Sequence, residues 1–210
     1  MMLQRRQVHA LGLSALALPA SLFFRPSNAH AAGLNAPAPD FTLFDTRGAP
    51  VQLSSFKGKP VVLEWNNPGC PYVRKHYNGN LQALQKEFTG KGVIWLAINS
   101  TETGSADHMP PAKLAAWMRE KGASPSATLM DEDGQVGKLY SARVTPHMYI
   151  IDAEGLLVYA GGIDSIPSAR AADIEKATNY VRQGLTELLA GKSVSTPSSQ
   201  PYGCSIKYQA

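Results

Sequence analysis

The chain has 210 residues, 44% of them hydrophobic and 17% charged, which is an ordinary globular composition and excludes an intrinsically disordered chain. Its two cysteines are too few for a disulfide-rich scaffold or a four-cysteine zinc module. Three of the 20 basic residues lie in the first 31 positions, which hold no acidic residue, so the remaining chain has 17 basic against 16 acidic side chains and offers nucleic acid no basic surface.

Residues 1–31 have the pattern of a secretory signal peptide. Arg5-Arg6 forms a positive segment, Ala10 to Phe24 forms an apolar run, and Ala29-His30-Ala31 supplies a small-x-small cleavage pattern. We therefore expect cleavage near Ala32 and a mature protein that is periplasmic or otherwise exported, without a stable membrane span. The arginine pair partly matches a twin-arginine signal, so both export routes stay open. An uncleaved anchor helix is the alternative, although the apolar run is shorter than the roughly 20 residues that span a bilayer.

The expected mature chain begins with a β-hairpin. Strands are predicted at Phe41–Phe44 and Val51–Leu53, on either side of the turn Asp45–Gly48. Val61–Trp65 is an apolar run broken only by Glu64, which is typical of a strand buried on both faces of a sheet.

A helix is expected to follow this strand. Asn67-Pro68-Gly69 turns the chain, and Cys70-Pro71 places a proline in the first turn of the helix. Gly79 is expected to interrupt the helix, which then continues through apolar positions at helical spacing over residues 81–88.

The second half of the chain alternates strands and helices. The elements predicted in chain order are a strand at Val93–Ile98, a helix through residues 114–118 that ends near Gly122, a strand at Ala127–Met130, a helical turn at Val136–Tyr140, a hairpin of Met148–Ile151 and Leu156–Tyr159, and a last helix from Ile174 to Leu188. This order predicts an α/β domain over residues 32–191, with a central mixed sheet, helices on both faces and an N-terminal β-hairpin. Residues 192–210 are expected to form a tail that carries Cys204.

Cys70 has the position of an activated thiol. It follows a buried strand and lies at the start of a helix, where free N–H groups and the helix dipole favour the thiolate. Arg74 and Lys75 lie about one turn further on and are expected to add positive charge that stabilises the thiolate.

Four segments together resemble the thioredoxin-fold redoxins, the superfamily of thioredoxin-like reductants and the alkyl hydroperoxide reductase / thiol-specific antioxidant (peroxiredoxin-like) proteins. The segments are Ala38–Phe41 with Leu53–Lys59, Val61–Cys70, Val144–Pro146 and Asp152–Gly155. They resemble the N-terminal hairpin of exported redoxins, the active-site strand and turn, the cis-proline segment and a hairpin turn. The resemblance covers roughly Ala38 to Ala190 and implies the thioredoxin-like fold.

The resemblance implies roles for three further residues. Pro146 would be cis and would place the backbone of Thr145 against the Cys70 sulfur, where it binds an extended substrate. Glu64 matches the buried carboxylate that thioredoxins use as a proton acceptor, and burial in an apolar run would raise its pKa toward that task. An acid on the outward face of the strand is the alternative.

The chain departs from both family patterns at the active site. The CxxC motif of thioredoxins has a second cysteine in the fourth position, where this chain has Val73. The proline and the threonine or serine that precede a peroxiredoxin cysteine are replaced by Leu63 and Asn67, so the usual peroxide-binding pattern is absent.

Cys204 is therefore the remaining candidate for a second thiol. Ser193–Gln200 is expected to be a flexible linker that lets Cys204 fold back to Cys70 and resolve it. A static structural disulfide and two free thiols are the alternatives, although two cysteines in an oxidising compartment tend to pair.

These residues predict an exported oxidoreductase that performs thiol–disulfide or antioxidant chemistry through Cys70, without a cofactor. Its expected partners are protein or small-molecule thiols and disulfides. A peroxiredoxin-like peroxidase that reduces hydroperoxides is one alternative. A copper-handling or non-catalytic module is another, since His147 follows Pro146 and could join both cysteines around a metal ion.

Overall fold

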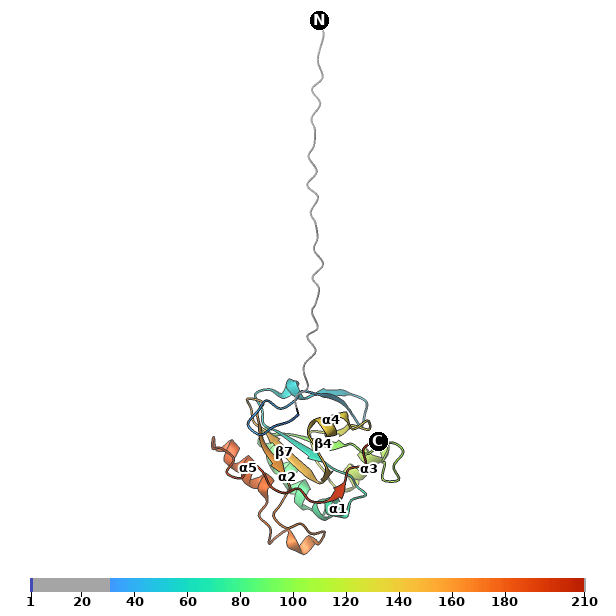
Figure 1. The fold of residues 1–210 in the computed structure, drawn as a ribbon, viewed down its shortest axis with the longest axis vertical. Coiled ribbons are helices and arrows are strands. Elements are labelled where there is room, and N and C mark those ends of the chain that lie inside the picture. The colour runs from blue at the N-terminus through green and yellow to red at the C-terminus, as the bar shows by residue number, and fades with distance from the viewer. Residues whose placement is uncertain (2–30, 210) are drawn as a thin grey trace.

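The structure is a computed structural model that describes residue 1 and residues 31–209 (Figure 1). The predicted signal peptide lies almost wholly in residues 2–30, outside the described residues. Within the described part of the chain, no helix is long and apolar enough to cross a membrane.

A seven-stranded mixed sheet forms the centre of the molecule, in the order β2-β1-β5-β4-β3-β7-β8. The strands are β1 (Thr42–Asp45), β2 (Pro50–Gln52), β3 (Val61–Trp65), β4 (Ile94–Asn99), β5 (Ala127–Met130), β7 (His147–Ile151) and β8 (Leu157–Gly161). The central strand β3 pairs parallel with β4 and antiparallel with β7. β1 and β2 form the predicted N-terminal hairpin, and β7 and β8 form the predicted second hairpin.

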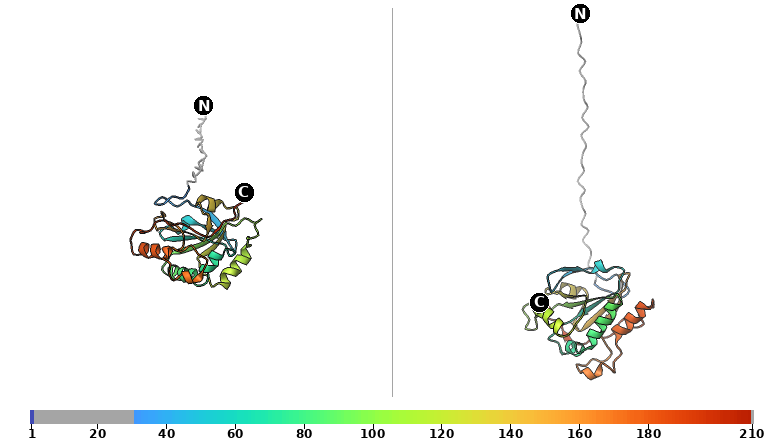
Figure 2. Two further views of the ribbon diagram at one scale, coloured as in Figure 1. Left: turned by 60° about the horizontal axis from the view of Figure 1, so that its bottom comes forward. Right: turned by 180° about the vertical axis from the view of Figure 1, so that it is seen from behind.

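Helices cover both faces of the sheet, as the sequence predicts (Figure 2). The helices are α1 (Pro71–His76), α2 (Asn80–Gly90), α3 (Pro111–Glu120), α4 (Gln135–Leu139) and α5 (Tyr180–Leu189), with short 3-10 turns at Leu53–Phe56 and Ala171–Asp173. Gly79 separates α1 from α2 with a φ of 111°, a conformation that favours glycine.

Alternate residues of β3 point into two hydrophobic cores. Val62 packs in one core with residues of α2, α3 and α5, among them Leu84 and Phe88, which are fully buried. Leu63 and Trp65 pack in the other core with residues of the hairpin and of α4. This period-two alternation is what a strand covered on both faces requires. It fixes β3, and with it the loop that carries Cys70.

The last helix begins at Tyr180 rather than at Ile174, so its predicted start is wrong. Asn179 caps the helix, because its side-chain oxygen accepts a hydrogen bond from the backbone N–H of Arg182 at 2.9 Å. Before it, the Asp173 carboxylate accepts hydrogen bonds from Ser168 and Arg170 and holds a separate turn.

The segment after Gly191 is not a free linker. Residues 192–209, here called the C-terminal arm, run back along the sheet edge, where Ser198 forms a β-bridge with Ala160 of β8. Further on, β9 (Cys204–Ser205) pairs antiparallel with β6 (Val144–Thr145) in a second, two-stranded sheet (Figure 1). The prediction of a flexible Ser193–Gln200 is therefore wrong, since pairing with distant strands orders this polar segment.

Candidate active site

Cys70 lies in the loop between β3 and α1 and is the N-cap residue of that helix. The side chain of Asn67 holds the loop: its oxygen accepts from the N–H of Gly69 at 2.7 Å, and its amide donates to Thr101 at 2.8 Å. Pro71 then begins the helix, as predicted. The result is a thiol held at a helix start and only 3% exposed.

The cis-proline segment contacts this thiol. The peptide bond between Thr145 and Pro146 is cis, as expected. The Cys70 sulfur lies 3.1 Å from the carbonyl oxygen of Thr145, to which the thiol donates. The backbone of β6 thus passes directly beside the candidate nucleophile.

Cys204 lies beside Thr145, the residue whose carbonyl oxygen contacts the Cys70 sulfur. In the pairing of β9 with β6, Cys204 lies opposite Thr145. Partial burial, together with its hydrogen bond to Cys70, raises the pKa of Cys204 to about 12. Both cysteines are free thiols in this structure. The arm therefore brings Cys204 to Cys70, as a resolving role would require, and leaves it protonated at neutral pH.

A small cavity is lined by the two cysteines. It has a volume of about 40 Å³ and is lined by both cysteines with Asn66, Asn67, Gly69, Ser100, Thr101, Asp107, Thr145, Ser205 and Ile206. Within residues 31–209, the side-chain oxygen of buried Asn66 has no hydrogen-bond partner. A larger hollow of about 420 Å³ lies over the N-terminal hairpin and contains neither cysteine. The space at the sulfurs suits a molecule of a few heavy atoms.

Glu64 is fully buried, so the alternative of an outward-facing acid is wrong. Its carboxylate accepts hydrogen bonds from the hydroxyl of Tyr77 at 2.6 Å and the indole N–H of Trp95 at 2.7 Å. The side-chain amides of Gln85 and Asn66 donate to it at 3.1 and 3.3 Å. Burial nevertheless raises its pKa above the ordinary value of 4.5. Through Asn66, the buried carboxylate is linked to the cavity at the cysteines.

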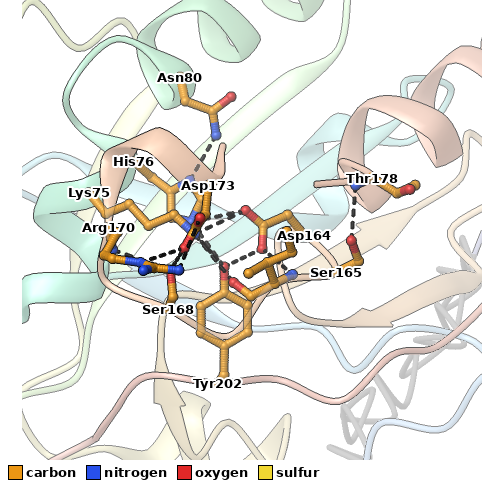
Figure 3. Close-up of polar contacts among 11 residues, drawn as sticks. Lys75, His76, Asn80, Asp164, Ser165, Ser168, Arg170, Asp173, Thr178 and Tyr202 are labelled. Carbon is orange, nitrogen blue, oxygen red and sulfur yellow. Dashed lines mark hydrogen bonds and ion pairs between the residues drawn. The ribbon is translucent and has the colours of Figure 1, made fainter. Parts of the chain in front are cut away.

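The two basic residues expected to stabilise a thiolate differ in place. Arg74 is exposed, and its guanidinium donates to the carbonyl oxygen of Pro68 at 2.7 Å, in the same loop as Cys70. Lys75 is buried, and its ammonium group donates to Asp164 at 3.3 Å and to the carbonyl oxygen of Ile166 (Figure 3). None of the hydrogen bonds of Lys75 reaches the Cys70 sulfur. Its charge is neutralised by Asp164, contrary to the expected role.

The histidines near the cysteines are buried and neutral. Burial lowers the pKa of His147 to about 4, and Arg143 acts in the same direction. The imidazole of His147 lies 3.2 Å from the hydroxyl of Tyr149, within the strand β7 that carries both. Across the described residues, no group of three or more His, Cys, Asp or Glu side chains has an arrangement that could hold a metal ion.

One neighbour of the cysteines is missed by sequence reasoning. Asp164, which binds both Lys75 and Tyr202, lies in a loop after β8 and has no motif. Tyr202 and Gly203, in contrast, indicate a docking arm from the sequence, because an aromatic residue and a glycine stand directly before the terminal Cys204.

Comparison with known proteins finds a thiol-disulfide oxidoreductase and a peroxiredoxin among the relatives of this chain. The sequence profile of the AhpC/TSA family matches residues 34–160. The chain is 31% identical over 121 residues to the thiol-disulfide oxidoreductase ResA of Bacillus subtilis, covering 58% of this chain and 63% of ResA. It is 30% identical over 134 residues to the chloroplastic peroxiredoxin Q of Sedum lineare, covering 58% and 65%. The chain thus spans under two thirds of the length of either relative.

Solved structures resemble this fold over most of the chain. An uncharacterized conserved protein from Geobacillus kaustophilus has a TM-score of 0.70 at 30% identity, covering 84% of this chain and 93% of that one. The exposed lipoprotein thioredoxin Etrx1 of Streptococcus pneumoniae has a TM-score of 0.53 at 24% identity, covering 71% and 99%. The expected thioredoxin-like fold is confirmed.

Proposed function

The chain belongs to the AhpC/TSA family, and on that premise we propose that it is an exported thiol–disulfide oxidoreductase with Cys70 as nucleophile and Cys204 as resolving thiol. One observation supports this assignment above the others. The chain has two cysteines, and the arm brings the second one to Thr145, the residue whose carbonyl oxygen contacts the sulfur of the first.

The reaction needs two thiols and an external disulfide. The Cys70 thiolate attacks one sulfur of the disulfide, the S–S bond breaks, and the first thiolate leaves and takes up a proton. Cys204 then loses its proton and attacks the Cys70 sulfur of the mixed disulfide, which releases the second thiol. The two cysteines are oxidised to one disulfide, and the substrate is reduced to two thiols. An external dithiol reduces the Cys70–Cys204 bond and completes the cycle.

Glu64 is the proton acceptor for the second step. The Cys204 thiol must give up its proton to a base before it can attack, because the thiolate is the nucleophile, and partial burial raises the pKa of this thiol. The buried carboxylate of Glu64 has a raised pKa, and its neighbour Asn66 lines the cavity that both cysteines share. The variant Glu64→Gln is expected to slow release of the second thiol by about 100-fold.

The test is the thiol count and mass of the reduced protein after one equivalent of a small disulfide. The wild type should lose two thiols, gain no adduct and become 2 Da lighter, with the disulfide joining Cys70 to Cys204. Cys204→Ser should retain one half of the substrate as an adduct on Cys70, and Cys70→Ser should not react. An adduct on Cys204 in the wild type, or unchanged turnover in Cys204→Ser, would contradict the assignment.

A second candidate, a peroxidase, is favoured by the size of the cavity. About 40 Å³ beside the sulfur admits a peroxide more readily than a large disulfide. The Cys70 thiolate would attack the O–O bond, forming a sulfenic acid and releasing water or an alcohol, and Cys204 would displace water to give the same disulfide. However, the two positions at which peroxiredoxins have the proline and the threonine or serine are Leu63 and Asn67 in this chain. Leu63 packs in the core, and the side chain of Asn67 is hydrogen-bonded to Gly69 and Thr101. Competition between peroxide and a small disulfide for Cys70 ranks the two functions by rate.

Export is part of the proposal and rests on residues 1–31. N-terminal sequencing of the protein recovered outside the cytoplasm should begin near Ala32. An intact Met1 in a membrane fraction would indicate an anchor instead.

A further inference from the structure

The strand edge beside Cys70 is occupied by the chain's own arm. β9 pairs with β6 through Val144 with Ser205 and Thr145 with Cys204, and the N–H of Ile206 donates to the carbonyl oxygen of Arg143 at 3.0 Å. An extended polypeptide that bound at Thr145 would need the same backbone groups. The arm and such a substrate are therefore mutually exclusive at this edge.

Gly203 lets the arm approach at backbone contact. Its φ is +145°, and a Cβ atom at this position would collide with the carbonyl oxygen of Thr145. Any larger residue would force the arm away from β6. The close approach of the arm to Thr145 therefore depends on the glycine at position 203.

Tyr202 fastens the arm to the helix that carries Cys70. Its hydroxyl lies in a buried cluster, where it donates to Asp164 and also contacts Lys75 at 3.4 Å and His76 at 3.2 Å (Figure 3). The side chains of Lys75, His76 and Asp164 are at most 2% exposed. The ring of Tyr202 packs edge-on against the ring of Tyr72, with 5.8 Å between the ring centroids, and lies beneath the Lys75 ammonium group. The arm is therefore held two residues before the resolving cysteine.

The other side of Cys204 is held as well. The ring of Tyr208 packs against Gly134 and Gly137, where a Cβ atom would collide with it, and its hydroxyl donates to the carbonyl oxygen of Ala142 at 2.8 Å. The contacts of Tyr202 and Tyr208 therefore hold the arm on both sides of Cys204, so that it lies across Cys70.

We propose that Tyr202 is a positioning residue. The contacts of its hydroxyl with Asp164, Lys75 and His76, here called the latch, keep the arm over Cys70 and make the site select small disulfides over extended polypeptides. This proposal rests on the proposed function of Cys70 and Cys204. A hydrogen bond to a buried carboxylate is worth roughly a 10- to 100-fold change in an equilibrium. Tyr202→Phe removes that bond, while Asp164 retains its contacts with Lys75 and with the N–H of Ile166. The variant should therefore fold and release the arm more often.

The experiment compares two substrates of the reduced protein. One is hydroxyethyl disulfide, and the other is an extended ten-residue peptide whose single cysteine is blocked as a mixed disulfide. Tyr202→Phe is expected to raise the ratio of peptide rate to small-disulfide rate by about 10-fold or more, and to slow closure of the Cys70–Cys204 bond. Tyr180→Phe is the matched control, because the tyrosine hydroxyl that contacts Lys75, His76 and Asp164 is that of Tyr202, whereas half-buried Tyr180 is not among the hydrogen-bond partners of these three side chains within residues 31–209.

A second variant and a second readout keep the test decisive. Gly203→Ala displaces the arm at Thr145 without touching the buried cluster and should raise the same ratio. Alkylation of Cys70 in a Cys204→Ser background, with a small and a bulky maleimide, reports the position of the arm without turnover. An unchanged ratio in both Tyr202→Phe and Gly203→Ala, or an equal rise in Tyr180→Phe, would overturn the latch. Loss of turnover in every protein, with bulky alkylation still faster in Tyr202→Phe, would support the latch and reject the proposed function.

Discussion

Replacing Glu64 by glutamine tests the buried carboxylate through the pH dependence of stability. The wild-type carboxylate is fully buried and accepts four side-chain hydrogen bonds, yet burial raises its pKa above 4.5. A carboxyl whose pKa is raised by folding favours the folded state while it is protonated, below the unfolded value. That contribution is lost as the pH rises toward the folded value.

The expected magnitude follows from this linkage. One pKa unit corresponds to about 1.4 kcal/mol, so the stability of the wild type relative to Glu64→Gln should fall by up to about 1.4 kcal/mol per pH unit above pH 4.5. The fall should stop at the folded pKa. At pH 4 both side chains are neutral, and the variant should be less stable by about 1 kcal/mol, because its amide nitrogen must face either Tyr77 and Asn66 or Gln85 and Trp95, all of which donate to the carboxylate in the wild type.

The assay is urea denaturation of both proteins between pH 4 and pH 8. The buried histidines His76 and His147 are present in both proteins, so their titration cancels in the difference. A difference in unfolding free energy that stays flat over this range, or that grows in favour of the wild type, would refute the raised pKa of Glu64.

Two further substitutions test the packing around the site. Asp164→Asn leaves the buried ammonium group of Lys75 without its carboxylate, so urea denaturation should show a loss of about 3–5 kcal/mol in unfolding free energy. A loss below about 1 kcal/mol would show that Lys75 and Asp164 do not form a buried ion pair. Leu84→Ala opens the core beneath α2 and should cost about 2–5 kcal/mol by the same assay, with the small-disulfide rate of the folded protein unchanged; a stability equal to the wild type would contradict the packing.

Local sequence patterns predicted most of the fold because they record burial. Val61–Trp65 alternates between two cores, and residues 81–88 follow helical spacing, so period and composition were enough to place β3 and α2. Cys70 and Pro146 were recognisable because each stands in a short motif, and the structure places their segments in contact.

The arm and its latch were less accessible to sequence reasoning. Lys75 contacts Asp164, which lies 89 positions away in the sequence. Thr145 pairs with Cys204, which lies near the end of the C-terminal arm. Such contacts depend on tertiary packing, which local periodicity does not encode. The polar composition of Ser193–Gln200 indicated a flexible linker, but hydrogen bonding to strand β8 orders it.

The most direct test of the account is peptide mapping of the reduced mature protein after one equivalent of a small disulfide, with the products quenched by acid. We predict a single intramolecular disulfide between the peptides that contain Cys70 and Cys204. Two free thiols after the reaction, or disulfides that link two copies of the chain, would contradict it.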